Sequence, residues 1–423
     1  MAGPLPRFTL PDTADVDADG RLSVGGVDVL SLAEEHGTPL FVYDEAHLRA
    51  RCREAVDAFG DGVAYASKAF LCKAMAGLAH AEGMCIDVST GGELAVALAA
   101  GVPGDRLVLH GNNKSTDELR MALDAGIGRI VVDSFDELDR LEALGRPADV
   151  LLRVTPGVEA HTHEYVMTGQ EDSKFGFGLR SGAAAAAVER VRSMAAAGVE
   201  LVGLHSHIGS QIFVVSSFVK AIEVLAGFFV PLDLPELVVG GGLGVPYVNG
   251  EEAPTISQWA RAVHDAASDV GIPSAVRVTT EPGRSIVATA GVTLYTVGTI
   301  KALPGIRTYL AVDGGMSDNP RPVLYGSGYE AFLPRATWAE RPFVATIVGK
   351  HCESGDVIVR DASLPADVRV GDVVCTPVTG AYGHSMASNY NRVPRPEVVF
   401  ARDGDARVVV RRETYDDLLR LDL

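Results

Sequence analysis

Basic residues are scarce in this sequence, and so are long apolar runs. Lysine and arginine total 37 against 55 aspartate and glutamate residues, which gives a formal net charge of −18 at pH 7. Nucleic acid and anionic membrane surfaces would repel such a chain, so we expect no nucleic acid and no membrane as partner and a small-molecule ligand instead. No apolar run approaches the length of a membrane span, and the first residues lack the basic and apolar regions of a signal peptide. The expected location is therefore the cytoplasm.

Cysteines are also few. There are five, an odd number, and no two of them form a C-x-x-C pair, which favours neither a zinc ribbon nor a secreted disulfide framework. What the sequence does have is 423 residues, of which 47% are hydrophobic and 22% charged, as in a globular protein with a full core. That length predicts two domains.

Short apolar segments alternate with segments of helical periodicity through the first two thirds of the chain. The alanine-rich stretch 181–197 is the clearest of the helical segments. Eight strands alternating with helices predict a parallel (β/α)8 barrel of the TIM type, which we place at residues 45–290. The strands are expected at 63–69, 84–89, 106–111, 129–134, 150–155, 201–207, 237–241 and 276–281.

The helical period disappears after about residue 290. Short β-type segments separated by Gly, Pro and Asp follow, which predicts a separate, mostly antiparallel β domain at 291–423. We expect residues 1–44 to add strands to this domain, because they contain strand-like segments as well. The later β segments are expected at 292–300, 308–312, 343–348, 356–360, 372–378, 397–401 and 406–412.

Lys68 stands in the apolar segment 64–70, near the end of the first expected barrel strand. Its Ala and Phe neighbours predict a poorly solvated ammonium group, whose pKa falls toward the range in which a free amine attacks carbonyls. The alternative is a lysine whose aliphatic stem packs while its ammonium group reaches water. Polar residues also follow the other strands, and the carboxyl ends of barrel strands share one mouth. They are Asp87, Ser89, His110, Asn112, Asp133, Arg153, His205, His207, Glu281 and Arg284.

Two glycine-containing turns follow the seventh and eighth expected strands. The run 240–244 can bring backbone N–H groups close to a phosphate, although a glycine run alone is often only a tight turn. Its place after the seventh barrel strand favours phosphate. Glu281 and Arg284 belong to the second turn, where the carboxylate could hold a pyridine nitrogen protonated. A local ion pair between the two residues is the alternative.

His205 and His207 form an H-x-H pair, and His161 and His163 form another. Such pairs can bind a metal, which keeps a metal-dependent barrel hydrolase as an alternative from a different class. We predict no metal, because the further His and Asp ligands that such hydrolases use are missing from the required strand ends. His207 could instead stack on an aromatic cofactor or pack in the core.

The β domain contains a second set of candidate residues. Cys352 and Glu353 stand in an expected turn, and a thiol is a competent proton donor near neutral pH. Arg321, Tyr325 and Tyr382 are flanked by Gly, Pro and Asn. Each of these three alone is more often a loop residue than a ligand.

In their order along the chain, these segments resemble those of the fold-type III pyridoxal-phosphate-dependent decarboxylases. The similarity covers nearly the whole chain and rests on YASKAF, DVSTGGEL, HGNNKS, VDSFDEL, SKFGFGL, HSHIGSQ, GGGLGVPY, EPGR, DNPRPVLY, CESGD and GAYGHSMASNYN. The branch of the family that it resembles acts on meso-2,6-diaminopimelate. The resemblance therefore implies decarboxylation of this compound to L-lysine and CO2, the last step of lysine biosynthesis, with pyridoxal 5'-phosphate as cofactor.

The resemblance also implies a role for each candidate residue. Lys68 would form the Schiff base with the cofactor, His207 would stack on its ring and Glu281 would pair with the pyridine nitrogen. Cys352 would protonate the decarboxylated carbon, and together with Glu353 it would reach the site of the neighbouring subunit in a homodimer. The implied cofactor-binding residues are Lys68, Asp87, His207, Ser210, Gly241, Gly242, Glu281, Gly283, Arg284 and Tyr382. The implied substrate-binding residues are Arg284, Arg321, Tyr325, Glu353 and Tyr382.

Other activities remain open on the sequence. The same cofactor could act on a related amino acid, whereas an alanine racemase-like enzyme should use a tyrosine base in place of Cys352. A non-catalytic cofactor carrier is a further alternative, against which Cys352 and Glu353 argue. Arg284 and Arg321, with an acid, suit the distal zwitterion of diaminopimelate better than a lone distal cation. One departure from the family pattern is Pro320, which restricts the backbone beside Arg321.

Overall fold

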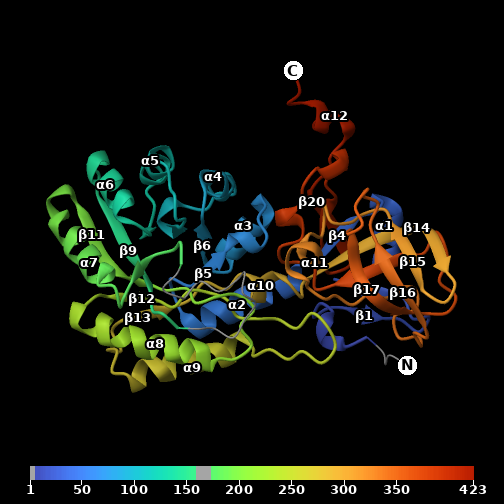
Figure 1. Ribbon diagram of the computed structural model, residues 1–423, viewed down its shortest axis with the longest axis horizontal. Coiled ribbons are helices and arrows are strands. Elements are labelled where there is room, and N and C mark those ends of the chain that lie inside the picture. Colours follow the sequence, from blue (N-terminus) through green and yellow to red (C-terminus); the bar gives the residue numbers. More distant parts are fainter. Residues whose placement is uncertain (1–4, 159–172) are drawn as a thin grey trace. The chain divides into compact units, whose positions relative to one another are not determined.

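The computed structural model describes residues 5–158 and 173–423, and the chain divides into two compact units. The barrel unit comprises Arg51–Val245 and Ala253–Ser285, and the β unit comprises Met1–Ala50, Pro246–Glu252 and Ile286–Leu423 (Figure 1). Residues 45–50, 246–252 and 286–290 fall within the predicted barrel range of 45–290 but group with the β unit. For residues 246–252 the reason is local, because Tyr247 packs edge-on against Tyr329 and the Asn249 N–H donates to Glu330 Oε1 at 3.2 Å.

Eight parallel strands form the sheet of the barrel unit, in the order β13-β12-β11-β9-β8-β7-β6-β5. The first strand, β5, also bonds to the segment that follows the last strand, β13, which closes the barrel. The N–H groups of Ala64 and Ala66 donate to the carbonyls of Thr280 and Pro282, both at 3.1 Å. The predicted parallel barrel is therefore confirmed, with a strand at each of the eight predicted places. The strands are β5 (Ala64–Ala66), β6 (Cys85–Val88), β7 (Leu107–Leu109), β8 (Arg129–Val132), β9 (Ala148–Thr155), β11 (Val199–His205), β12 (Glu236–Val238) and β13 (Arg277–Thr279), and the short β10 (Phe177–Gly178) pairs with β9.

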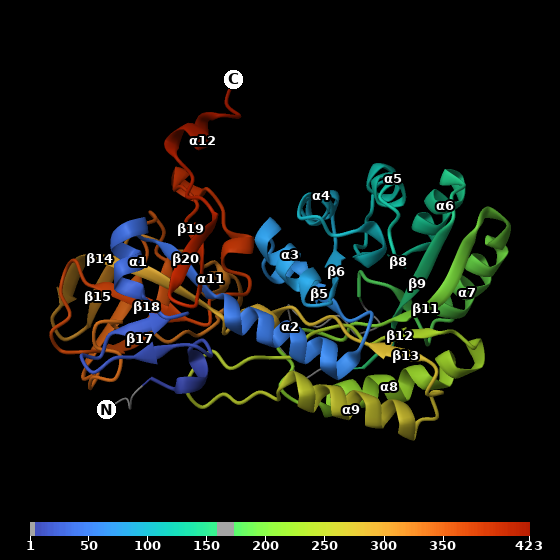
Figure 2. The same cartoon turned by 180° about the vertical axis from the view of Figure 1, so that it is seen from behind.

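Helices lie around the outside of these strands (Figures 1 and 2). The space inside is filled by a cluster of small and branched side chains, one from each of seven strands: Ala64, Cys85, Val108, Val131, Leu151, Val202 and Val238. A barrel filled in this way is a packed core and not a pore, so chemistry has to take place at its mouth. These helices are α2 (Glu45–Phe59), α3 (Lys73–Ala81), α4 (Gly91–Ala99), α5 (Thr116–Asp124), α6 (Phe135–Leu144), α7 (Ala183–Ser193), α8 (Ser216–Phe229) and α9 (Ile256–Asp269), and the short α10 (Arg284–Val287) follows β13.

Several turns from strand to helix end in a hydroxyl residue that caps the helix. The side-chain oxygens of Thr90, Ser115 and Ser134 accept hydrogen bonds from the backbone N–H of Glu93, Glu118 and Glu137 respectively. Such a cap provides a partner for an N–H group that the first helical turn leaves without one. The turns after β6, β7 and β8 are thereby fixed, and so are the residues at the ends of these strands.

The β unit contains a mixed sheet in the order β17-β16-β15-β14-β4-β19-β20, with β18 paired to β14. Only the β4–β19 and β15–β16 pairs are parallel among the pairs of this sheet that the structure describes, so the predicted mostly antiparallel character is confirmed. β4, from the N-terminal part of the chain, lies between β14 and β19. The strands are β4 (Leu40–Asp44), β14 (Gly291–Leu303), β15 (Arg307–Val312), β16 (Phe343–Val348), β17 (Val357–Leu364), β18 (Val373–Pro377), β19 (Glu397–Arg402) and β20 (Asp405–Val410).

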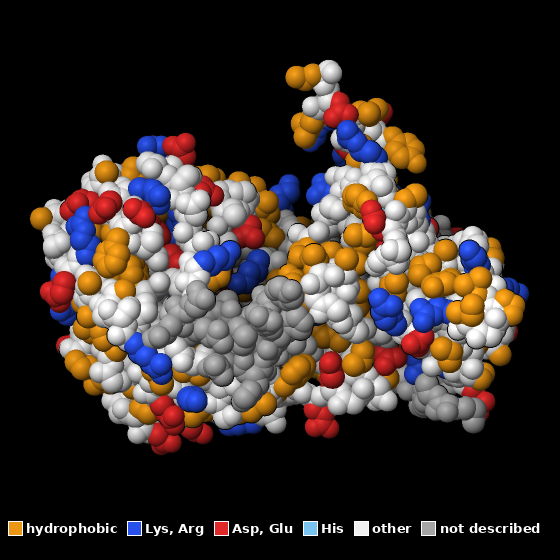
Figure 3. Space-filling model, viewed as in Figure 1, with side chains coloured by type: hydrophobic (Ala, Val, Ile, Leu, Met, Phe, Trp, Pro, Cys, Tyr) orange, Lys and Arg blue, Asp and Glu red, His pale blue; other side chains and the backbone are white. Residues whose placement is uncertain are grey.

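Smaller elements complete the β unit. A three-stranded sheet precedes α1 (Val29–His36), and the short helices α11 (Arg321–Tyr325) and α12 (Tyr415–Leu419) follow later. The small sheet consists of β1 (Asp15–Val16), β2 (Leu22–Val24) and β3 (Val27–Asp28). Acidic and basic side chains are intermixed over the face shown in Figure 3. Among the described residues, no helix is both long enough and apolar enough to cross a membrane.

Candidate active site

A buried carboxylate, Glu281, lies between two histidines at the carboxyl end of the barrel strands. Its Oε1 is 2.9 Å from His110 Nε2, and its Oε2 is 2.9 Å from His205 Nε2. The two imidazole rings meet edge to face with centroids 5.0 Å apart. Burial alone would raise the pKa of Glu281, but the two histidines hold it well below its ordinary range. Glu281 is therefore ionised at neutral pH.

The pKa values of the two histidines shift in opposite directions. Burial lowers the pKa of His205 to about 4, so this ring is neutral and its Nε2–H donates to Glu281. Burial acts on His110 in the same direction, but the carboxylates of Asp87 and Glu281 outweigh it and raise the pKa of His110. Asp87 is buried in β6, and the distance from its Oδ1 to His110 Nε2 is 3.8 Å. Burial raises the pKa of Asp87 to about 6, so this acid titrates close to neutral pH.

His207 follows β11 and is held by the glycine turn. The Gly241 N–H donates to its Nδ1 at 3.2 Å, so the neutral ring carries its proton on Nε2. Burial, followed by the positive charges of Lys68 and Arg153, holds the pKa of His207 well below its ordinary value. A Cβ at Gly240 would lie only 2.9 Å from Nδ1, so the turn fits closely against the ring. His207 is therefore a neutral imidazole of fixed orientation.

Lys68 lies in a 3-10 turn, Ser67–Ala69, that follows β5. Ser67 and Ala69 are buried but Lys68 is exposed, so the expectation that its apolar neighbours keep it from water is wrong. The strand ends at Ala66, and the turn directs successive side chains to different sides. The positive charge of Lys68 adds to the lowering of the His207 pKa and partly offsets the rise in the Asp87 pKa. Its amine therefore lies within electrostatic reach of both groups.

The loops that follow β11 and β12 are tied together. The Ile212 N–H donates to the Gly242 carbonyl and the Gly244 N–H donates to the Ile212 carbonyl, both at 2.9 Å. Gln211 adds two side-chain bonds to the backbone of Val245, at 2.7 and 3.3 Å. The two loops therefore form one rigid surface.

Glycine is required at three positions of the barrel mouth: two lie in the loop after β12 and one, Gly283, lies in the turn after β13. A Cβ at Gly241 would lie 2.2 Å from the Glu281 carbonyl oxygen, and a Cβ at Gly283 would lie 2.9 Å from Ala66. Gly242 has a φ of +111°, and a Cβ there would lie 2.1 Å from a carbonyl oxygen. Since no side chain fits, the backbone itself forms this part of the mouth.

Ser210 and Arg284 form a polar pair within the barrel unit. Arg284 is the first residue of α10, and its Nη2 donates to Ser210 Oγ at 3.0 Å. Both residues are half-buried. A hydroxyl and a guanidinium beside a glycine-lined backbone are groups that bind a phosphate.

Arg321 is held in a fixed orientation in the β unit, where it begins α11. It is buried, its Nη1 donates to the Tyr329 hydroxyl at 2.7 Å, and its Cζ lies 4.0 Å from the centroid of the Tyr247 ring. Pro320 precedes it with φ −77° and ψ −12°, a conformation that proline adopts readily at the start of a helix. Tyr325 ends the same helix and is half-buried.

The other predicted residues of the β unit lie in turns. Cys352 and Glu353 are both exposed between β16 and β17, and the other four cysteines of the chain are buried. Tyr382 is half-buried and has a φ of +58° in the turn after β18. The structure thus gathers the predicted barrel-unit residues at one mouth and places Arg321, Tyr325, Cys352, Glu353 and Tyr382 in the β unit.

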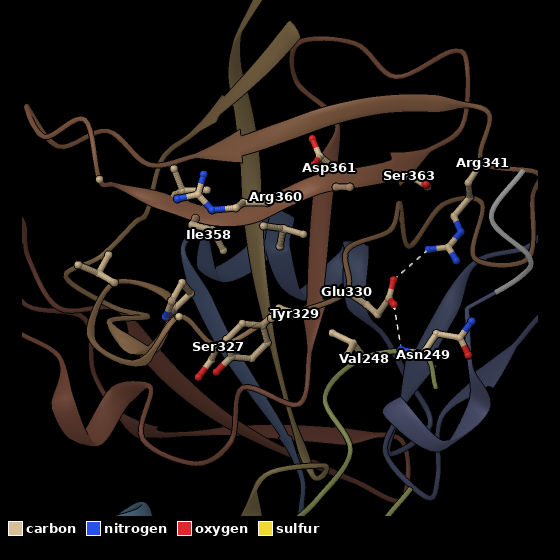
Figure 4. A pocket seen from close by; sticks show the side chains of 18 residues that line it. Val248, Asn249, Ser327, Tyr329, Glu330, Arg341, Ile358, Arg360, Asp361 and Ser363 are labelled. Atoms are coloured by element: carbon tan, nitrogen blue, oxygen red, sulfur yellow. Dashed lines mark hydrogen bonds and ion pairs between the residues drawn. The ribbon is translucent and has the colours of Figure 1, made fainter. Parts of the chain in front are cut away.

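The β unit also contains a cavity of about 570 Å³, shown in Figure 4. Within it Glu330 Oε2 lies 3.6 Å from Arg341 Nη1, and Tyr329 forms another part of the lining. Tyr329 is also the residue whose hydroxyl accepts from Arg321. None of the predicted site residues lines this cavity, so it is separate from the candidate active site.

Sequence reasoning missed two contacts near the mouth. The sequence places His110 at the end of a strand but does not predict its contact with Glu281. Lys114 was overlooked, although it is buried, lies 2.7 Å from Glu137 Oε1 and donates to the Val131 carbonyl. Both residues belong to the HGNNKS segment, and a lysine flanked by polar residues gives no sign that it will be buried.

Residues 45–288 match the family model of the pyridoxal binding domain of the pyridoxal-dependent decarboxylases. The chain belongs to this family. It is 48% identical to a diaminopimelate decarboxylase from Mycobacterium tuberculosis and 49% identical to one from Bacillus subtilis, with 98% of this chain covered in each case and 97% and 98% of those proteins.

Solved structures agree with this membership. A diaminopimelate decarboxylase from M. jannaschii in complex with L-lysine matches with a TM-score of 0.89 at 34% identity, covering 97% of this chain and 98% of that one. One from Helicobacter pylori complexed with L-lysine matches with a TM-score of 0.84 at 32% identity, covering 93% and 99%. The chain is thus a pyridoxal-phosphate-dependent amino acid decarboxylase.

The residues at the barrel mouth fit pyridoxal 5'-phosphate. The glycine-lined backbone beside Ser210 and Arg284 suits a phosphate, the buried and ionised Glu281 suits a protonated ring nitrogen, and the exposed Lys68 supplies a primary amine.

The metal-dependent hydrolase hypothesis is wrong for a member of this family. Among the described residues, His110, His205 and Glu281 lie close enough to share a cation, but His207 takes no part in that group. The predicted second H-x-H pair, His161 and His163, lies outside the described residues.

Proposed function

We propose that this chain decarboxylates meso-2,6-diaminopimelate to L-lysine and CO2. The observation that carries the proposal is the full-length likeness, at 48% and 49% identity, to relatives named diaminopimelate decarboxylase. The barrel mouth supports it, because it combines an exposed amine, an ionised carboxylate and an anion-binding backbone surface.

The barrel unit would hold the cofactor. Pyridoxal 5'-phosphate, when bound, supplies a ring that accepts the electron pair left behind by the departing CO2. Lys68 would hold its aldehyde carbon, Glu281 its ring nitrogen and His207 one face of its ring. The further cofactor-binding residues in this proposal are Asp87, Ser210, Gly241, Gly242, Gly283, Arg284 and Tyr382.

Glu281 has the charge that its role demands. Its two histidine neighbours keep it ionised, and an ionised carboxylate beside a ring nitrogen favours the protonated form of that nitrogen. His205 remains neutral and uses its proton to orient Glu281. The fixed and neutral His207 can lie against a ring without adding a charge to it.

The β unit would supply the groups for substrate binding and protonation. Arg321 is already oriented by two tyrosines, so little side-chain entropy is lost when its guanidinium binds a carboxylate. Glu353 would bind an ammonium group, and Cys352 would donate the proton to the carbon that loses CO2. Arg284, Tyr325 and Tyr382 complete the proposed substrate-binding set.

The proposal includes a homodimer in which Cys352 and Glu353 serve the neighbouring subunit. The exposure of both residues on one turn supports it. Mixing the inactive variants Lys68→Ala and Cys352→Ala should then restore part of the activity. No activity in a mixture that sizing shows to contain mixed dimers would refute shared sites. A cytoplasmic location is also part of the proposal, and the five free cysteines support it.

The test is an absorption spectrum and a product assay on one purified sample. The protein should absorb visible light through its cofactor, the spectrum should change on addition of meso-2,6-diaminopimelate, and lysine and CO2 should appear in equal amounts. Ornithine, arginine and lysine, which lack the distal carboxylate, serve as competing substrates. Faster turnover of any of these three, or a protein that neither contains nor takes up a vitamin B6 derivative, would refute the proposal.

A further inference from the structure

The turn that carries Cys352 and Glu353 is anchored at its base by Asp356. This buried carboxylate accepts hydrogen bonds from the Met316 N–H at 2.7 Å and from the N–H and Nδ1 of His351 at 2.9 and 2.8 Å. Residues 352–355 at the tip are all exposed, and the Glu353 carbonyl accepts a hydrogen bond from the Asp356 N–H at 3.1 Å. An exposed tip keeps its backbone freedom unless another part of the chain holds it.

That other part is the 3-10 turn Tyr390–Arg392, which contacts the tip at two points. The Tyr390 hydroxyl donates a hydrogen bond to Glu353 Oε1, and Asn391 Oδ1 accepts from the Cys352 N–H at 3.3 Å. The hydrogen bond to Glu353 also raises the pKa of Tyr390, so the phenol remains a donor. Both residues that the proposed function assigns to this tip are therefore held from the same turn.

The conformation of Tyr390–Arg392 suits this contact. The Tyr390 ring stacks on the His351 ring, with centroids 5.7 Å apart and an angle of 11° between the planes. Asn391 has a φ of +52°, a left-handed conformation that asparagine tolerates better than most residues. Arg392 ties the turn to the C-terminal segment, donating to the Leu418 carbonyl at 2.8 Å and to Asp422 at 3.0 Å.

We propose that Tyr390 and Asn391 are positioning residues that hold Glu353 and Cys352 in their working orientation. Tyr390 fixes one oxygen of the Glu353 carboxylate and leaves Oε2 to accept from a substrate ammonium group. Asn391 fixes the backbone at Cys352 and so the direction of its thiol. This inference rests on the proposed function for what the two residues do, but the contacts themselves can be tested without substrate.

The first test uses Tyr390→Phe, which removes the hydroxyl and keeps the ring on His351. We expect the KM for meso-2,6-diaminopimelate to rise roughly tenfold, the size of a lost hydrogen bond to a charged group, while kcat changes by less than about twofold. Tyr415→Phe is the matched control, because Tyr415 is exposed in the same unit and should leave both constants unchanged. In a Glu353→Gln background, Tyr390→Phe should have much less effect, since the two residues act through one contact.

The second test needs no turnover. Cys352 is the exposed thiol among five cysteines, so rapid reaction of the native holoenzyme with an aromatic disulfide reagent reports on this residue. Asn391→Gly keeps the left-handed backbone and removes the side chain, and we expect it to change the rate of that reaction at least about threefold. Tyr415→Phe should react like the unmodified protein.

The outcomes separate this inference from the proposed function. An unchanged KM in Tyr390→Phe, or an unchanged thiol rate in Asn391→Gly, would overturn the positioning role even if diaminopimelate is turned over normally. If Tyr390→Phe lowers kcat and the melting temperature together, Tyr390 is a merely structural residue, and this outcome would also overturn the positioning role. If diaminopimelate is not a substrate, the thiol rate still decides whether Asn391 holds the tip.

Discussion

Asp87→Asn should make the cofactor-free protein more stable, and increasingly so as the pH rises. Asp87 is buried beside Glu281 and His110, and its pKa is raised to about 6 chiefly by burial. The folded state therefore disfavours the ionised form of this acid. Asparagine has nearly the same shape and carries no charge, so it removes the cost of burying one.

The magnitude follows from the pKa. An ordinary aspartate titrates near 3.9, and a difference of one in pKa corresponds to ~1.36 kcal/mol, so ionised Asp87 lowers the free energy of unfolding by about 3 kcal/mol. For an acid with a raised pKa this cost is absent below the unfolded pKa and complete only above the folded one. The same two pKa values give about 1.5 kcal/mol at pH 5 and about 3 kcal/mol at pH 8.

Urea and thermal unfolding at pH 5 and pH 8 would measure the effect. For a unit of this size the melting temperature should rise by roughly 6–12 °C at pH 8, because each kcal/mol shifts it by about 2–4 °C. Asp265→Asn, at an exposed position of α9, is the matched control and should change stability little at either pH. An Asp87→Asn variant that is no more stable at pH 8 than the unmodified protein would refute the reasoning, and so would an equal gain at both pH values.

Three further variants test other parts of the barrel unit. Lys68→Ala should abolish the visible absorbance of the purified protein and nearly all turnover, and a variant that keeps its colour would disprove covalent anchoring at this amine. Gly242→Ala should raise the dissociation constant of pyridoxal phosphate at least about tenfold in an absorbance titration, because its Cβ would lie 2.1 Å from a carbonyl oxygen. Gly227→Ala, where a Cβ would meet nothing within 4 Å, should bind the cofactor normally. Lys114→Met should lower the free energy of unfolding, measured in urea at pH 7, by about 3–5 kcal/mol, because it leaves the buried Glu137 carboxylate without its ion-pair partner. A loss below ~1 kcal/mol would show that this ion pair contributes little to stability.

The sequence was sufficient to predict the barrel. Parallel strands covered on both faces appear as continuous apolar runs, and segments such as 150–155 and 201–207 can be recognised on that basis alone. Residues that follow successive strands then share one mouth by topology, which is why Lys68, His207 and Glu281 could be grouped before their positions were known. Their roles in the reaction stay predictions.

What the sequence could not predict depends on the direction of turns and on closure of the barrel. The exposure of Lys68 results from a 3-10 turn of three residues, which the neighbouring alanines do not encode. His110 follows β7 and Glu281 follows β13, which are far apart in the sequence. The two side chains therefore come into contact only when all the strands of the barrel are in place. The contact of Tyr390 with Glu353 depends likewise on a left-handed residue, Asn391.

The central place of β4 has a consequence for synthesis on the ribosome. All five residues of Leu40–Asp44 are buried, and their sheet partners begin at residues 291 and 397. At roughly 5–20 residues per second, the roughly 250 residues between Asp44 and Gly291 take roughly 12–50 s to be translated. The barrel strands up to Thr279 leave the ribosomal exit tunnel before β14 does and can close first. A nascent chain stalled after residue 282 has emerged, but with residues from 291 onward still in the tunnel, should therefore contain a closed barrel and an unpaired apolar strand, which is the kind of segment that chaperones bind.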